Sequence, residues 1–140
     1  MIIGKSEQKN DVFDVLFFVY RNVVSALVPK FIRQIGSYAF SGCQSLKKIE
    51  FENESDLNSI GKGSFSNSFI EEISIPKHVK IIGEEAFSRC YKLKKIEFIE
   101  DSELHTIEKF AFEDSSIESI SIPANVEDLQ EGWCKGTSKL

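Results

Sequence analysis

The strongest constraint on the fold of this chain is an internal repeat. Residues 82–98 read IGEEAFSRCYKLKKIEF, and residues 35–51 read IGSYAFSGCQSLKKIEF. Weaker copies keep the same register, and their opening apolar residues are separated alternately by 22 and 25 positions: Phe13, Ile35, Ile60, Ile82, Ile107 and Leu129. A fixed period of about 20 to 50 residues is typical of arrays whose units stack on their neighbours. The 140-residue chain is therefore expected to fold as a solenoid, because one unit cannot bury its apolar face alone.

Each unit repeats the same apolar positions after its opening residue. A large apolar residue comes five positions later, in turn Phe18, Phe40, Phe65, Phe87, Phe112 and Cys134. A triplet follows, as in Leu46/Ile49/Phe51, Ile70/Ile73/Ile75, Leu93/Ile96/Phe98 and Ile117/Ile120/Ile122. Its end alternates with polar residues, which predicts a short strand with one buried face. We expect a parallel sheet with one strand per coil, a 3₁₀ or α turn at each phenylalanine, and Phe87 buried between Phe65 and Phe112.

Prolines and glycines mark the corners of the coils. Pro29, Pro76 and Pro123 lie 47 residues apart, each directly after the last apolar residue of a short unit. Proline has no N–H for a ladder and ends the strand there, whereas the long units turn through residues 52–56 and 99–103. Glycine follows the opening residue at positions 36, 61 and 83, which allows a tight corner or a close approach between coils. Glu108 and Gln130 replace that glycine later, so we expect the corner there to avoid positive φ.

The register divides a single solenoid domain, residues 1–140, into four parts. Residues 1–10 are polar and are expected to be frayed. Residues 11–30 are interpreted as a degenerate N-terminal capping coil, in which Phe13 and Phe18 stand at the positions of Ile60 and Phe65. Residues 31–126 hold the regular repeats, and residues 127–140 form an incomplete C-terminal repeat.

Composition narrows the classes of function. The chain is 41% hydrophobic and 28% charged, which is the range of soluble globular proteins. Its net charge is −5 with Lys and Glu interleaved, which argues against a nucleic-acid groove lined by a basic stripe. Residues 12–28 are the most apolar, but Asp14 and Arg21 interrupt them, so no transmembrane helix is predicted. Ten mostly polar residues precede this segment, and no signal peptide is predicted.

The repeat positions resemble those of a known family. The run Gly-x-x-Ala-Phe-x-x-Cys-x-x-Leu-x-x-Ile-x-Phe, alternating with Ile-x-x-Ile-x-Ile-Pro-x-x-Val-x-x-Ile-Gly, is similar to the BspA-like leucine-rich repeats. The resemblance covers residues 11–132, and residues 10–16 resemble the start of BspA-like surface antigens. It implies a right-handed leucine-rich-repeat solenoid with a surface or secreted adhesion and binding role and no enzymatic activity. The chain departs from the pattern at Ser64, Ser68, Ser115 and Trp133.

The residues that carry chemistry form no catalytic or metal-binding constellation. Cys43 and Cys90 share one repeat position two coils apart, which is roughly 10 Å. A disulfide needs Cα atoms within about 7 Å, so we expect buried free thiols, and Cys134 is also expected to stay unpaired. His78 and His105 are expected in exposed turns, because no ligand recurs beside them at metal-binding spacing. The sequence predicts no enzyme, no metal and no cofactor.

The outward positions of the predicted strands are the candidate binding surface. They form two rows across the coils: Lys48, Glu72, Lys95 and Ser119, and then Glu50, Ser74, Glu97 and Ser121. One interpretation is a solvated face on which Lys48, Glu72 and Lys95 pair across neighbouring strands. The other is a broad, rigid platform that binds a partner.

Two functional hypotheses use this face. The first is a non-enzymatic interaction module, a surface or secreted adhesion-type protein that binds a protein or a glycan. The alternative is a cytosolic scaffold for protein–protein interaction. The sequence identifies neither the ligand nor the location.

The C-terminal end predicts a further contact. Residues 118–122 are expected to form an edge strand with neither Lys nor Pro inside it for protection. Exposed edges pair with other chains. The chain is therefore expected to self-associate through its C-terminal edge, unless it is part of a longer array.

Overall fold

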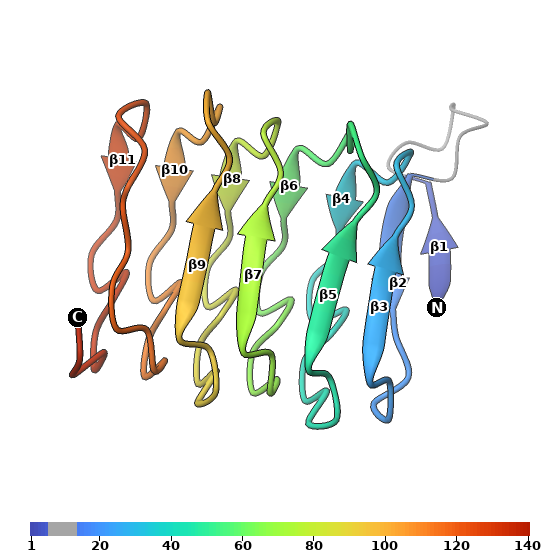
Figure 1. Ribbon diagram of the computed structural model, residues 1–140, viewed down its shortest axis with the longest axis horizontal. Coiled ribbons are helices and arrows are strands. Elements are labelled where there is room, and N and C mark those ends of the chain that lie inside the picture. The colour runs from blue at the N-terminus through green and yellow to red at the C-terminus, as the bar shows by residue number, and fades with distance from the viewer. Residues whose placement is uncertain (6–13) are drawn as a thin grey trace.

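The computed structural model describes residues 1–5 and 14–140 as a stack of coils (Figure 1). Its strands are β1 (Ile2–Gly4), β2 (Val15–Phe18), β3 (Ser25–Val28), β4 (Gln34–Ile35), β5 (Lys48–Phe51), β6 (Ser59–Ile60), β7 (Glu72–Ile75), β8 (Ile81–Ile82), β9 (Lys95–Phe98), β10 (Thr106–Ile107) and β11 (Asp128–Leu129). The described residues contain no helix. The predicted solenoid is confirmed.

The regular coils have two strand positions rather than the expected one. The predicted triplets form the four-residue strands β5, β7 and β9, with β3 as their counterpart in the first coil. The opening residues form a second set of two-residue strands, which join β1 and β2 in one seven-stranded sheet ordered β1-β2-β4-β6-β8-β10-β11. Its pairing is parallel apart from β1, and Ile60 faces Ile35 on one side and Ile82 on the other. Two residues are too few to show an alternating pattern, so the sequence did not reveal this sheet.

The four-residue strands pair only in twos. β3 pairs with β5 and β7 with β9, each joining a short unit to the long unit that follows it. Among the described residues, no ladder of hydrogen bonds joins β5 to β7. Pro76 contributes to the break, because it has no N–H to donate after the last residue of β7. Among the described residues, the segment 118–122 that follows β9 in this layer makes a single bridge, from Ser119 to Lys95, so the predicted edge strand at 118–122 is wrong.

A column of phenylalanine rings forms the centre of the core. Phe40, Phe65, Phe87 and Phe112 are fully buried. Successive rings are stacked with centroids 4.9, 5.1 and 5.3 Å apart, and Trp133 closes the column edge-on at 6.2 Å. The predicted burial of Phe87 between Phe65 and Phe112 is confirmed.

The segment around each phenylalanine is a series of turns, so the expected 3₁₀ or α turn is wrong. In the coil of Phe87, the amides of Glu85, Phe87 and Arg89 donate to carbonyl groups of the next coil at 3.2, 2.7 and 2.7 Å. Glu85 and Arg89 adopt left-handed φ values of 55° and 56°. The same spacing recurs at Tyr38/Gly42, Gly63/Asn67, Phe110/Asp114 and Gly132/Gly136. A helical turn would keep these amides within its own coil, and here they hold neighbouring coils together.

The glycines after the opening residues serve close contact between coils. Gly36, Gly61 and Gly83 do not adopt positive φ. A Cβ on Gly61 would lie 2.6 Å from the Ile35 carbonyl oxygen and 3.0 Å from the carbonyl carbon of Gly36. Glu108 and Gln130 also avoid positive φ, as predicted.

The first coil follows a different register from the predicted one. Leu16 pairs with Ile35, and the Val19 amide donates to the Ala39 oxygen at 3.1 Å. Leu16 and Val19 therefore take the positions assigned to Phe13, which lies outside the described residues, and Phe18. Phe18 lies off the column, edge-on to Tyr20 at 6.1 Å and beneath the Arg21 guanidinium at 5.0 Å.

The shift has a simple cause in chain length. Only seven positions separate Leu16 from the triplet residue Val23, whereas ten separate Ile60 from Ile70. In this shorter coil Val19, rather than Phe18, takes the place next to Phe40 in the ladder of main-chain hydrogen bonds.

The N-terminus adds a strand to the first coil. β1 runs antiparallel to β2, with Ile3 opposite Leu16 (Figure 1). The expectation of a frayed N-terminus is wrong for Ile2–Gly4, and residues 6–10 lie outside the described part. An antiparallel strand covers the edge that β2 would otherwise expose.

The three cysteines are free thiols. Cys43 and Cys90 are buried at the same repeat position two coils apart, and the buried Ser68 takes that position in the coil between them. Cys90 Sγ donates to the Phe65 carbonyl oxygen at 3.1 Å and lies 3.6 Å from Ser68 Oγ. Burial raises the pKa of the Cys90 thiol to about 12, so the reactive thiolate is scarce at neutral pH.

Thiol labelling tests this arrangement. In the native protein at pH 8 we expect the half-buried Cys134 to react first, with Cys43 and Cys90 protected. In denaturant without reductant, all three should react. Recovery of a peptide linking Cys43 to Cys90, or equal native labelling of Cys90 and Cys134, would contradict the stacked column.

Candidate functional site

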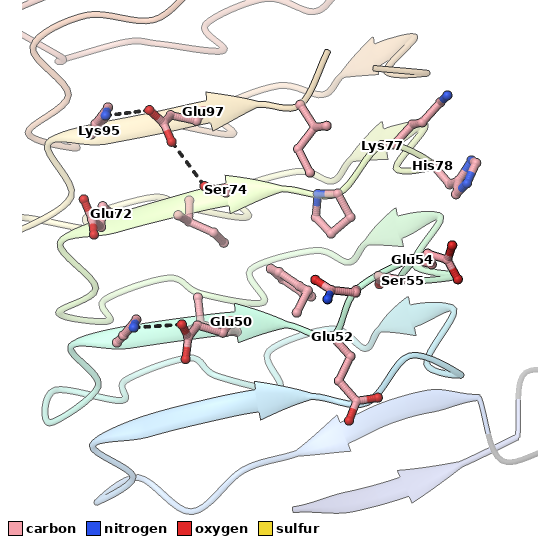
Figure 2. A pocket seen from close by; sticks show the side chains of 17 residues that line it. Glu50, Glu52, Glu54, Ser55, Glu72, Ser74, Lys77, His78, Lys95 and Glu97 are labelled. Carbon is pink, nitrogen blue, oxygen red and sulfur yellow. Dashed lines mark hydrogen bonds and ion pairs between the residues drawn. The ribbon is translucent and has the colours of Figure 1, made fainter. Parts of the chain in front are cut away.

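All eight predicted binding residues are exposed, and six of them line one groove. These six are Lys48, Glu50, Glu72, Ser74, Lys95 and Glu97. Groove 1 has a volume of about 620 Å³ and crosses β5, β7 and β9 (Figure 2). Its walls are the long-unit loop at residues 52–55 and the proline turn at residues 76–78. It therefore lies over the break in pairing between β5 and β7.

Charged residues in groove 1 pair along strands rather than across them. Lys48 Nζ lies 2.7 Å from Glu50 Oε1, and Lys95 Nζ lies 2.5 Å from Glu97 Oε1. Hydrogen bonding to Glu50 and Glu97 is the main cause that raises the pKa of Lys48 and Lys95, and Glu72 adds only a weak attraction to each. The expected pairing of Lys48, Glu72 and Lys95 across strands is thus reduced to this weak attraction, and among the described residues Glu72 forms no close ion pair with either lysine. Ser74 Oγ also donates to Glu97 Oε2 at 3.3 Å (Figure 2).

A second groove repeats the first along the solenoid. Groove 2, of about 400 Å³, is lined by Phe98, Ile99, Glu100, Asp101, Ser102, Ser121, Ile122, Pro123, Ala124 and Asn125. Apart from Ile122, each of these residues comes 47 positions after a residue that lines groove 1. The predicted Ser121 lines this groove, and Ser119 lines neither. Ile99 lines both, so the two grooves meet at its side chain, which is 49% exposed.

Both grooves carry an excess of acidic side chains beside apolar ones. Groove 1 is lined by five Glu against three Lys, and groove 2 by Glu100 and Asp101 with no Lys or Arg. Phe51 and Ile99 add apolar surface to groove 1. The strand alternation missed these wall residues. The 47-residue spacing of prolines and long loops was the signal that could have found them.

A cross-coil ion ladder does exist, but at a different repeat position. Lys62 Nζ lies 3.2 Å from Glu84 Oε2, and Lys109 Nζ lies 3.3 Å from Glu84 Oε1. These residues stand two positions after the opening residues of three successive coils. The hydrogen bond from Lys62 and the positive charge of Lys109 lower the pKa of Glu84.

Replacing the central residue of this ladder should have a salt- and pH-dependent effect. Because folding lowers the pKa of Glu84, its contribution is present above its ordinary pKa of 4.5 and is lost as pH falls through the folded-state value. We expect Glu84→Gln to lower the melting temperature at neutral pH in low salt, and the difference to shrink in 1 M salt and in acid. The control Glu131→Gln should show neither trend. An effect of Glu84→Gln that is unchanged by salt would exclude an electrostatic origin.

The two histidines lie in separate exposed loops. His78 Nδ1 lies 2.9 Å from Glu103 Oε1 in an exposed contact between turns, and His105 is exposed before β10. Within residues 1–5 and 14–140, no group of three or more His, Cys, Asp or Glu residues could hold a metal ion. In the same residues, no helix has the length and apolarity needed to cross a bilayer.

Comparison with protein families gives a match over most of the chain. A family model described as the BspA type leucine rich repeat region matches residues 14–140 in six copies. The chain belongs to the BspA type leucine-rich-repeat family. This match agrees with the resemblance read from the sequence. A search of curated proteins finds no match.

Solved structures of BspA-like and other leucine-rich-repeat proteins share this architecture. The pneumococcal vaccine antigen PcpA is 33% identical, with a TM-score of 0.78 over 81% of this chain and 28% of its own. A leucine-rich cell surface protein from Faecalibacterium prausnitzii is 22% identical, with a TM-score of 0.62 over 84% of this chain and 38% of its own. A leucine-rich repeat protein from Eubacterium ventriosum is 21% identical, with a TM-score of 0.66 over 80% and 30%. The chain thus spans well under half the length of these proteins.

Proposed function

We propose that this BspA type repeat protein is a non-enzymatic interaction module of the surface or secreted adhesion type. It binds a protein or a glycan through the exposed strand face that contains grooves 1 and 2. The observation that carries this proposal is the pair of contiguous grooves at equivalent repeat positions. Solenoids use such extended surfaces for binding. The similarity to PcpA, which is described as a vaccine antigen, supports exposure on a cell surface.

A selection experiment with a blocking variant tests the binding face. Random peptide and glycan libraries are screened against the immobilised 140-residue chain, and the selected ligands are measured by calorimetry. Ser74→Arg places a long side chain in groove 1 and should abolish binding. Ser119→Arg is the matched control, because Ser119 is exposed on the same face, lines neither groove, and stands where Lys48 and Lys95 stand in other coils.

The outcomes of this experiment are distinct. Ligands that tolerate Ser119→Arg but not Ser74→Arg support the proposal. Equal binding by both variants, or no selected ligand, overturns it. A reagent that labels only the outer surface of intact source cells is expected to modify the chain. A chain that stays unlabelled would favour the alternative, a cytosolic scaffold that uses the same face.

The C-terminal coil offers a further contact, between two copies of the chain. β11 is the last strand of the seven-stranded sheet, Leu129 and Leu140 are 45% and 47% exposed, and Trp133 is only half-buried. Open sheet edges with apolar residues pair with other chains. We expect sedimentation to show a mass that rises with concentration, and Leu129→Lys to reduce the rise. Leu27→Lys, at an exposed site on β3, is the control. A clean monomer at high concentration would exclude this association.

A further inference from the structure

This inference rests on the proposed function. The geometry points to the class of ligand, which is an extended basic segment of a partner protein in the polyproline II conformation. Such a segment would lie along the solenoid axis and place one basic side chain in each groove. Three features carry this inference, namely the rise between the grooves, their charge and their exposed polar groups.

The grooves recur at the pitch of a polyproline II helix. Equivalent residues of grooves 1 and 2 are two coils apart, and two successive ring steps in the core measure 5.1 and 5.3 Å. The groove repeat is therefore about 10 Å. A polyproline II chain repeats its side-chain direction every three residues, or about 9.3 Å. A β-strand repeats every two residues, or roughly 6.6 Å, which leaves it out of step with the grooves.

The charge of the grooves selects a basic ligand. In groove 1, Lys48 and Lys95 are already paired with Glu50 and Glu97. Glu72 lies between them on β7, exposed and without an ion pair in the described residues (Figure 2). In groove 2, Glu100 and Asp101 face no basic lining residue. A lysine or arginine in each groove would meet a carboxylate that forms no ion pair within the described residues.

The polar groups of the groove walls distinguish an extended chain from a helix. Two helical turns rise about 10.8 Å and would also fit the repeat. However, a helix satisfies its own backbone groups, whereas a polyproline II backbone leaves its carbonyl oxygens free to accept hydrogen bonds. The exposed Asn53 amide and Lys77 ammonium on the walls of groove 1 can donate to such oxygens. Phe51 and Ile99 supply apolar surface for the proline rings.

The test uses peptides of equal composition and different spacing. The first probe is (Pro-Pro-Lys)₄, and the second has the same eight Pro and four Lys with its lysines in one block. The third is a helical Ala-rich peptide with lysines seven apart, and the fourth is Pro-Pro-Lys-Pro-Pro, whose single lysine reaches only one groove. Dissociation constants are measured by fluorescence anisotropy at low and at physiological salt. We expect (Pro-Pro-Lys)₄ to bind roughly tenfold more tightly than each of the others, because it engages both grooves.

Neutral variants locate the binding. Glu72→Gln and Asp101→Asn should each weaken (Pro-Pro-Lys)₄ by roughly threefold and together by roughly tenfold, because each removes one exposed charge pair. Asparagine tolerates the left-handed conformation of Asp101, whose φ is 59°, so the fold is kept. Glu131→Gln, away from both grooves, is the control for net charge.

Several results would overturn the inference. One is that the periodic peptide binds no more tightly than the peptide with its lysines in one block, and another is that the helical peptide binds more tightly than both. The inference also fails if Glu131→Gln weakens binding as much as Glu72→Gln and Asp101→Asn do, or if no peptide binds at millimolar concentration. Ligands from the library selection that depend on Ser74 but carry no basic residue at every third position would keep the proposed binding function and overturn only this assignment of the ligand.

Discussion

Phe87→Ala is expected to destabilise the protein by about 3–5 kcal/mol, the range for removing a fully buried phenylalanine. The ring is stacked between Phe65 at 5.1 Å and Phe112 at 5.3 Å, so its loss leaves a cavity at the centre of the column. Neighbouring coils are held by main-chain hydrogen bonds and cannot collapse fully onto it. Urea denaturation followed by circular dichroism measures the loss.

Phe18→Ala provides the matched control for this substitution. Phe18 is half-buried outside the column and contacts Tyr20 and Arg21. Its loss should cost only about 1 kcal/mol. Equal costs for the two substitutions would show that the column does not dominate the core. Because coils contact only their neighbours, Phe87→Ala should also produce local opening of adjacent coils, visible as faster amide exchange around Phe65 and Phe112.

Gly61→Ala should be the most damaging substitution at a site with no side chain. The added Cβ would lie 2.6 Å from the Ile35 oxygen and 3.0 Å from backbone atoms of Gly36 and Ser37. These atoms belong to the backbone of the preceding coil and cannot rotate away. We expect a loss of at least about 2 kcal/mol, at the upper part of the range for overpacking.

Gln130→Ala is the control, since Gln130 stands at the same repeat position in the last coil. Its amide donates to Asp128 and its oxygen accepts from the Lys109 amide, so trimming it removes exposed hydrogen bonds without a clash. Differential scanning calorimetry should show a much larger fall in melting temperature for Gly61→Ala. A stability equal to that of the unchanged protein would contradict the close approach between coils.

The apolar register predicted most of the architecture because side-chain burial repeats strictly. The column of Phe40, Phe65, Phe87 and Phe112 and the four-residue strands followed from it. The turns around each phenylalanine did not follow, because the conformations of Glu85 and Arg89 depend on hydrogen bonds to another coil. The first coil also escaped prediction, since Leu16 and Val19 are as apolar as the phenylalanines beside them.

The candidate binding face was only partly predictable. Alternation along the strands identified the outward residues, and all of them are exposed. It could not show that β5 and β7 remain unpaired, because pairing is a property of two segments. The ion ladder through Glu84 was not predicted, because its residues lie at the corners of the coils and belong to no alternating strand.

The pairing of strands in twos sets the smallest unit by which such an array can grow or shrink. Loss of one coil would place two long or two short units next to each other and leave one strand of a β3–β5 or β7–β9 pair without its partner. Loss or duplication of a 47-residue pair of coils would leave every remaining junction between units of the same kinds as before. Each duplicated pair would also carry its own copy of the groove. Changes in copy number can therefore lengthen the grooved face without any new junction having to evolve.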